Sequence, residues 1–139
     1  MNATNIELEL KRLSCSKGII ACALVAIDSG IIYFTTSNIK EFQMIAEGAR
    51  DYWSLQNRNG KIYDILGDLD NIKIRHKKGI ICLQPCGENT LLVALTKMNK
   101  VNWNDWMEKT KHLDKYYELL EKENNQSLTK ITRQLNKRD

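Results

Sequence analysis

The feature that most restricts the fold is an uninterrupted apolar run over residues 19–27, IIACALVAI. It is about half the length of a membrane-spanning helix, which needs about 20 apolar residues. The turn signal DSG follows at residues 28–30, and a second β-prone run covers residues 31–36. The pattern predicts a hairpin. Because both alternating sets of side chains in its first strand are apolar, this strand must be central in a sheet that is covered on both faces.

The same run also permits a secretory signal peptide, since Lys11, Arg12 and Lys17 precede it and its length suits a hydrophobic core. A helix-like segment comes before it, however, and a strand-like run follows at once, which favours a folded domain. We therefore expect a cytoplasmic protein that makes no use of a membrane.

Helical patterns are predicted on either side of the hairpin. Thr4 and Glu7 fit a capping box, and Ile6, Leu10 and Leu13 then recur on one helix face. Ser37 or Asn38 can cap a long helix over residues 39–57. Strands are predicted at residues 72–77, 80–84 and 91–96. Asn102 can cap a last helix with Asp105 at its third position, and one stripe of that helix comprises Trp106, Thr110, Leu113, Tyr117 and Leu120.

The resulting order α-β-β-α-β-β-β-α predicts an α/β domain with a five-stranded, mainly antiparallel sheet and helices on both faces. We expect this domain to span residues 1–122 and a polar C-terminal tail to span residues 123–139. A chain of 139 residues is long enough to bury a core without staples.

The four cysteines indicate a reduced, structural role. Cys22 and Cys82 lie inside apolar runs, where a free thiol behaves as a small hydrophobe. Only Cys82 and Cys86 are closely spaced, and no second pair has zinc-site spacing. We expect all four, Cys15 included, to be buried or half-buried.

The sequence contains no phosphate-binding loop, no paired-glycine dinucleotide loop, no nucleophile elbow and no His-x-x-x-His. His76 is predicted to point inward at a strand end, and His112 to be solvated. A Cys–His pair assembled by the fold is left open by sequence separation alone. Trp53 and Trp106 are predicted to be core residues, and Trp103 to be more exposed. We expect no enzymatic activity, no catalytic residue, no metal and no cofactor.

The basic run KIRHKK supplies four candidate partner-binding residues: Lys73, Arg75, Lys77 and Lys78. Lysines on an edge strand also deter unwanted strand pairing. Clustered cations can otherwise bind an acidic protein surface or, as the least favoured option, the phosphates of nucleic acid.

The helix predicted over residues 39–57 carries more apolar surface than a sheet requires. On a helical wheel, the sheet-facing arc comprises Ile39, Phe42, Ile45, Ala46, Ala49, Tyr52 and Trp53. Met44, Gly48 and Leu55 gather on a separate flank. A glycine inside a helix costs about 1 kcal/mol against alanine, so close approach of a second helix at Gly48 is the predicted compensation. Alternatively, Gly48 is merely tolerated, or it packs under residues 61–68.

We therefore expect a homodimer with Met44, Gly48, Leu55, Ile72 and Ile74 at its interface. The last two lie on the edge strand, which can pair across the dimer axis if acidic groups face its lysines and arginine.

Over residues 6–120 the sequence resembles the roadblock (dynein light-chain) family, of the prokaryotic type. The resemblance rests on Gly18 opening the apolar strand, the DSG turn, the helical segment MIAEGA and the strand pair KKGIICLQPCGENTLLVALTK. It implies a non-catalytic, dimeric α/β domain that binds Ras-like small GTPases or serves as a scaffold. The basic third strand, the polar tail and the long segment 61–68 depart from the family pattern. A small-molecule-sensing domain of similar architecture is the alternative, and it would need a sizeable apolar pocket.

Overall fold

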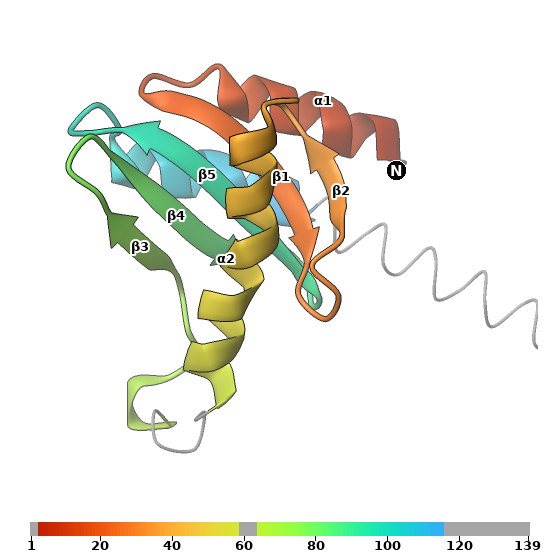
Figure 1. The fold of residues 1–139 in the computed structure, drawn as a ribbon, viewed down its shortest axis with the longest axis vertical. Helices are drawn as coiled ribbons and strands as arrows, with labels where there is room; N and C mark the ends of the chain where they lie inside the picture. Colours follow the sequence, from red (N-terminus) through yellow and green to blue (C-terminus); the bar gives the residue numbers. More distant parts are fainter. Residues whose placement is uncertain (1–2, 59–63, 116–139) are drawn as a thin grey trace, which may run out of the picture.

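All strand pairs of the sheet are antiparallel, in the order β2-β1-β5-β4-β3 (Figure 1). The structure is a computed structural model that describes residues 3–58 and 64–115. Its elements are α1 (Ala3–Ser14), β1 (Ile19–Ala26), β2 (Ile32–Thr35), α2 (Lys40–Arg58), β3 (Ile72–Arg75), β4 (Gly79–Pro85) and β5 (Thr90–Lys97). A last helix is described over residues 103–115. The predicted fold class is confirmed.

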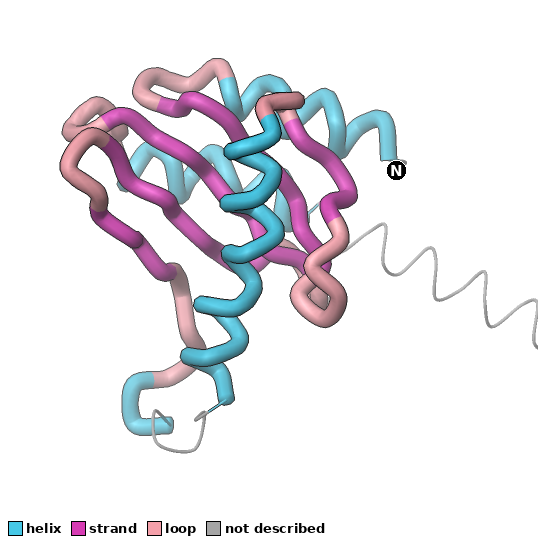
Figure 2. Tube along the Cα trace, viewed as in Figure 1, coloured by secondary structure: helices cyan, strands magenta, loops and turns pink. Residues whose placement is uncertain are grey.

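The sheet lies between two helical layers (Figures 1 and 2). The α2 helix covers one face, where Phe42, Ala46, Ala49 and Trp53 are buried. The α1 helix and the last helix cover the other face. Their buried side chains there include Ile6, Leu10, Leu13, Trp106 and Leu113.

The β1 strand is buried on both sides, as its sequence requires. Cys22 and Leu24 join the core under α1, whereas Ala23 and Val25 join the core under α2. Ile20 was expected to point inward and is instead 50% exposed. The register of β1 against β5 shifts between Ile19 and Ala21, so Ile20 is the extra residue of a bulge and leaves the alternation.

The α1 helix begins at Ala3, so Thr4 lies within the helix and the prediction that Thr4 is its N-cap is wrong. The predicted stripe of Ile6, Leu10 and Leu13 is confirmed, because each of these side chains is at most 2% exposed.

Two glycines hold the sheet ends close to neighbouring backbone. Gly18 has a φ of +86°, and a Cβ there would lie 2.7 Å from the carbonyl carbon of Lys100. A Cβ on Gly79 would clash with the carbonyl oxygen of Thr96. Only glycine fits such sites without displacing backbone, which gives a physical reason for the glycines that open β1 and β4.

A cap and a buried polar cluster fix the last helix to the sheet. The Asp105 N–H donates to Asn102 Oδ1 at 3.1 Å, which confirms the predicted cap. Trp106 Nε1 donates to Gln84 Oε1 at 3.0 Å, and Gln84 Nε2 donates to Thr110 Oγ1 at 2.9 Å. Gln84 on β4 therefore satisfies two buried polar groups of the helix at once. The predicted stripe members Tyr117 and Leu120, the domain boundary at residue 122 and the polar tail lie outside the described residues.

The cysteines are all free, but they differ in environment. Burial, and secondarily the neighbouring Cys82, raises the pKa of the Cys22 thiol to about 12. Burial also raises the pKa of Cys82 to about 11. Cys86 is buried, whereas Cys15 is exposed, contrary to expectation. Cys15 follows the end of α1 in a surface turn, where its N–H donates to the Arg12 carbonyl at 3.2 Å.

We expect a water-soluble disulfide reagent to modify Cys15 rapidly in the native protein and Cys22 and Cys82 only after opening of the structure. The reactive species is the thiolate, and burial suppresses both its formation and its access. The measurement is the time course with which the reagent releases its own thiol on reaction with the protein. It is recorded with and without denaturant for the wild type and for Cys15→Ser. Rapid modification of Cys22 in the folded chain would contradict the central position of β1.

Replacing Gln84 by methionine should lower the free energy of unfolding by about 1–3 kcal/mol, because it leaves the buried Trp106 N–H without its acceptor. The Thr110 hydroxyl loses the Gln84 donor but keeps its bond to the Met107 carbonyl. Urea unfolding gives this value directly. Gln43→Met, on the outer side of α2, is the control and should change stability by less than about 0.5 kcal/mol. Equal stability of the two variants would show that the cluster contributes nothing.

Candidate interaction surface

The outer side of α2 carries an apolar flank formed by Met44, Gly48, Tyr52 and Leu55. The three large side chains are 63%, 56% and 59% exposed in chain order. Their spacing places them on one arc of the helix. A Cβ added to Gly48 would meet nothing within 4 Å, so the flank has an open gap at its middle. The alternative in which Gly48 packs under a following segment finds no contact in the described part of the chain.

Two residues assigned to the sheet-facing arc of this helix are in fact exposed. Tyr52 lies on the apolar flank, and Ile39 is 62% exposed. The buried arc of Phe42, Ala46 and Trp53 already fills the space above β1, so Tyr52 at the margin of this arc stays outside. Ile39 precedes the first helical turn.

The α2 helix packs on β1, β2 and β5. On one side it is held by Arg50, whose Nη1 donates to the Asp28 carbonyl in the β1–β2 turn at 2.8 Å. By the helical wheel, Tyr52 therefore points to the opposite side, toward β4 and β3. This part of the sheet face is visible beside the helix in Figure 1.

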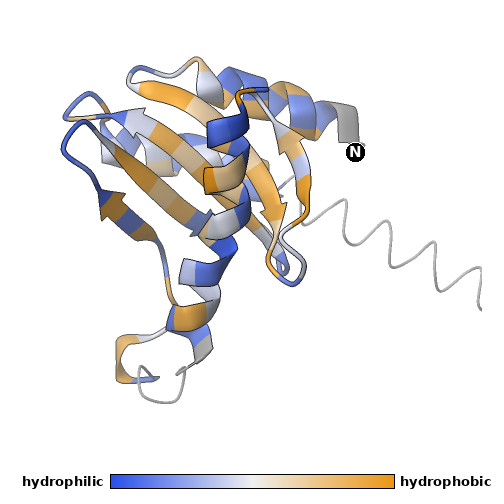
Figure 3. Cartoon of the chain, viewed as in Figure 1, coloured by the Kyte–Doolittle hydropathy of each residue, from blue (hydrophilic) through white to orange (hydrophobic). Residues whose placement is uncertain are grey.

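The β3 shelf, formed by Ile72, Ile74 and Ile81, lies on this side of α2. All three side chains are only half-buried. Ile72 and Ile81 pack against the core beneath α2, and Ile74 pairs with Ile81 in the register. Figure 3 shows apolar residues along these strands and on α2. The apolar flank and the β3 shelf together form one candidate interaction surface.

The segment before β3 extends this surface. Ile65 and Leu66 lie in a short helical turn and are 93% and 75% exposed. A shallow hollow between the end of α2 and this segment is lined by Gln56, Asn57, Leu66, Leu69 and three aspartates, Asp64, Asp68 and Asp70.

The β3 edge therefore has a charge polarity along the chain. Aspartates at residues 64–70 come before the strand, and Lys73 and Arg75 lie within it. Lys73 Nζ lies 4.4 Å from the centroid of the Trp103 ring, on the face of the last helix. Lys73 lowers the pKa of Cys82, while Asp70 raises it, so both charges lie near the same buried thiol.

The structure divides the predicted site residues into separate places. Ile72 and Ile74 belong to the β3 shelf, whereas Lys73 and Arg75 alternate with them toward the opposite face. Lys77 and Lys78 lie in the β3–β4 turn.

The sequence patterns also left several features of the site undetected. Tyr52, Ile65, Leu66 and the aspartates were not expected to take part in the surface. An inward His76 is also wrong, since His76 is exposed in the β3–β4 turn, where its N–H donates to the Gly79 carbonyl at 2.8 Å. His112 is exposed, Trp103 is half-buried and Trp53 and Trp106 are buried, all as expected.

Within residues 3–58 and 64–115, no group of three or more His, Cys, Asp or Glu side chains could hold a metal ion. None of the helices in the same ranges is both long and apolar enough to cross a bilayer.

No protein-family model matches the sequence, and no curated protein matches it either. Solved structures match its fold. A Roadblock/LC7 domain from Streptomyces avermitilis superimposes with a TM-score of 0.69 at 15% identity, covering 79% of this chain and 92% of that one. The chain has the roadblock fold. MglB from Myxococcus xanthus also gives a TM-score of 0.69, at 12% identity over 88% of this chain and 99% of MglB.

A structure of MglB in a tetrameric arrangement gives a TM-score of 0.70 at 11% identity, covering 88% of this chain and 93% of that one. These structures thus match 79–88% of the chain. At these identities the likeness concerns the fold, so the apolar flank and the charge-polarised edge have to be interpreted from this chain's own residues.

Proposed function

We propose that this roadblock domain is a non-catalytic, dimeric adaptor that binds a Ras-like small GTPase or a scaffold protein. The observation that carries the proposal is the apolar flank of α2, with three large exposed side chains around an open glycine. Full burial of such a side chain is worth about 1.5–3 kcal/mol, which gives a second protein chain a substantial reason to cover the flank.

A second copy of α2 fits this flank in a specific way. Helix axes that pack together lie about 8–10 Å apart, and small residues at the crossing permit the closest approach. Gly48 lies between Met44 and Leu55, where such a crossing would occur. Its cost inside the helix is offset only if something uses the gap.

The β3 edge supports an antiparallel arrangement of the two copies. A twofold axis near Ile72 would bring the aspartates at residues 64–70 of one copy toward Lys73 and Arg75 of the other. Opposite charges across neighbouring strands are favourable and like charges are not. The basic strand can therefore take part in self-association, because the acidic segment before it supplies the opposite charge.

The proposal that the partner beyond the second copy is a small GTPase or a scaffold protein is supported by the fold and by the resemblance of the sequence to the roadblock family. The sequence contains no phosphate-binding loop of its own, so a nucleotide-dependent role requires a separate GTPase. The alternative of a small-molecule sensor is disfavoured because aliphatic side chains fill both faces of β1. Four free cysteines support a cytoplasmic setting.

Gly48→Arg should convert the wild-type dimer into a folded monomer. The new side chain has free space in the single chain and replaces a poor helix former, but it would occupy the gap between two crossing helices. Light scattering at tens of micromolar measures the mass, and thermal unfolding checks the fold. Ser54→Arg, on the polar side of α2, adds the same charge and should remain dimeric.

A monomeric wild type at this concentration would refute self-association. If the Gly48→Arg variant is still dimeric, the dimer contact lies elsewhere than on the apolar flank. The charge reversal Asp70→Lys then tests the edge, because it should weaken the dimer and Lys73→Asp in the same chain should restore it.

The isolated protein should show no measurable binding or hydrolysis of GTP by calorimetry, since the chain offers no loop that cradles phosphates. A change in nucleotide hydrolysis or exchange should appear only when a Ras-like GTPase from the same organism is added. The size of this change should then be compared between Tyr52→Ala, on the exposed flank, and Ser54→Ala, on the polar side of α2. Micromolar GTP affinity of the protein alone would contradict the proposed role.

A further inference from the structure

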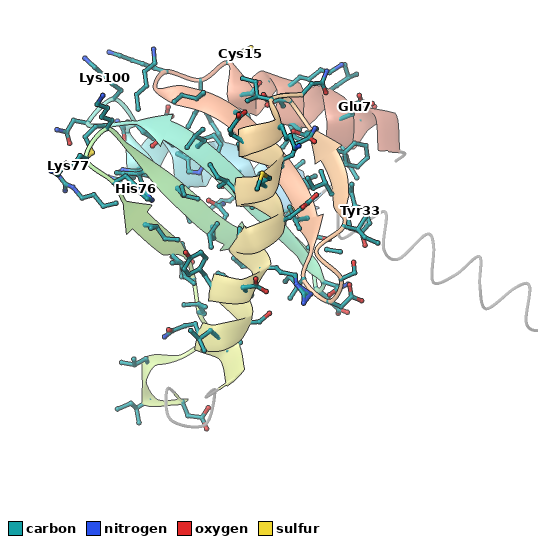
Figure 4. All side chains as sticks on the ribbon, viewed as in Figure 1. Glu7, Cys15, Tyr33, His76, Lys77 and Lys100 are labelled. Carbon is teal, nitrogen blue, oxygen red and sulfur yellow. The ribbon has the colours of Figure 1, made fainter. Side chains whose placement is uncertain are left out.

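Five lysines from three separate loops and strand ends gather at one end of the sheet. This basic rim consists of Lys17, Lys77, Lys78, Lys97 and Lys100, and each of the five residues is exposed. Figure 4 shows Lys77 and Lys100 at the same end of the molecule, next to His76. The rim is distinct from the apolar flank and does not depend on self-association.

The strand register explains how the rim forms. The Lys97 N–H donates to the Gly18 carbonyl at 2.8 Å, which places Lys17 beside the end of β5. On the other side, Lys97 pairs with Gly79, which immediately follows Lys78. The close contact of Gly18 with the Lys100 backbone adds the loop after β5 to the same end.

In the described part of the chain, no rim lysine forms an ion pair with a carboxylate. The ion pairs there lie on α1, α2 and the last helix. Asp105 lines a hollow together with Lys17 and Lys100, but its carboxylate pairs with Lys109 at 3.2 Å. The rim thus carries five cations, more than the formal net charge of +4 of the whole chain.

The composition of the rim distinguishes between possible partners. All five residues are lysines, which are depleted in protein–protein interfaces, where arginine and aromatic residues are enriched. Binding of single-stranded nucleic acid commonly uses aromatic rings on which bases stack. The Trp103 ring on the adjoining face already carries the Lys73 ammonium group. A set of flexible point charges on turns and a strand end instead suits a surface of diffuse negative charge.

We propose that the basic rim docks this protein on an anionic membrane surface, with the lysines among the lipid headgroups and without insertion of a helix. The sequence alone led us to expect no use of a membrane, because its apolar run is too short to span a bilayer. A peripheral contact through charge does not require such a span. Each lysine near an anionic bilayer strengthens binding by roughly fivefold, so the whole rim produces reversible attachment that depends on lipid charge.

The test is co-sedimentation of the full chain with vesicles of phosphatidylcholine, with and without phosphatidylserine. The wild type should bind only the vesicles that contain phosphatidylserine. It should be released when the ionic strength rises from about 0.1 M to about 1 M, which shortens the screening length from about 10 Å to about 3 Å. Lys77→Gln combined with Lys78→Gln should weaken the binding by roughly 25-fold.

The control is Lys111→Gln combined with Lys115→Gln, which removes the same charge from exposed positions on the last helix and should change the binding by much less. Thermal unfolding confirms that both variants fold. The proposal is overturned if the wild type does not bind phosphatidylserine vesicles, or if both pairs of substitutions weaken binding equally. It is also overturned if random RNA or polyglutamate binds the same lysines more tightly than the vesicles do, since the rim would then serve a different partner.

Discussion

The burial of β1 on both faces is the constraint from which the rest of the structure follows. Leu24 and Val25 are adjacent in sequence, point to opposite sides and are both fully buried. A sheet with one helical layer could bury only one of the two, so the chain has to place helices above and below the same strand. The pairing of β1 with β2 and β5 then places it inside the sheet.

The two layers are unequal, and this inequality creates the candidate interaction surface. A sheet of five strands is about 20 Å wide between its outer strands, whereas a helix with its side chains is about 10–12 Å across. Among the described residues, two helices cover the face under α1, whereas α2 is the one helix on the other face. Because Arg50 holds α2 toward the β1–β2 turn, the uncovered part lies over β4 and β3. The β3 shelf thus follows from how the described helices divide between the two faces.

Local patterns in the sequence were sufficient to predict most elements, because each has a clear period or cap. The Asn102 cap, the α1 stripe and the hairpin turn are examples. The bulge at Ile20 could not be predicted. A strand that is apolar on both sides has no alternation of apolar and polar residues, so a shifted register leaves no mark in its sequence. The exposure of Tyr52 depends on where α2 lies on the sheet, and the wheel alone carries no such information. His76 and Cys15 were misplaced for a simpler reason, because each follows the last residue of its element and lies in a turn.

Local patterns also could not predict how residues far apart in the sequence come together, and the distribution of charge is the main example. The run KIRHKK resembles a single basic patch, but the fold divides it between the β3 edge and the basic rim, where Lys17, Lys97 and Lys100 join it. In the proposed antiparallel dimer, the twofold axis near Ile72 directs the two rims toward opposite ends of the assembly. A flat membrane could then contact only one rim at a time. Attachment to the membrane would therefore gain no avidity from dimerisation, and the second rim would remain free in the bound state.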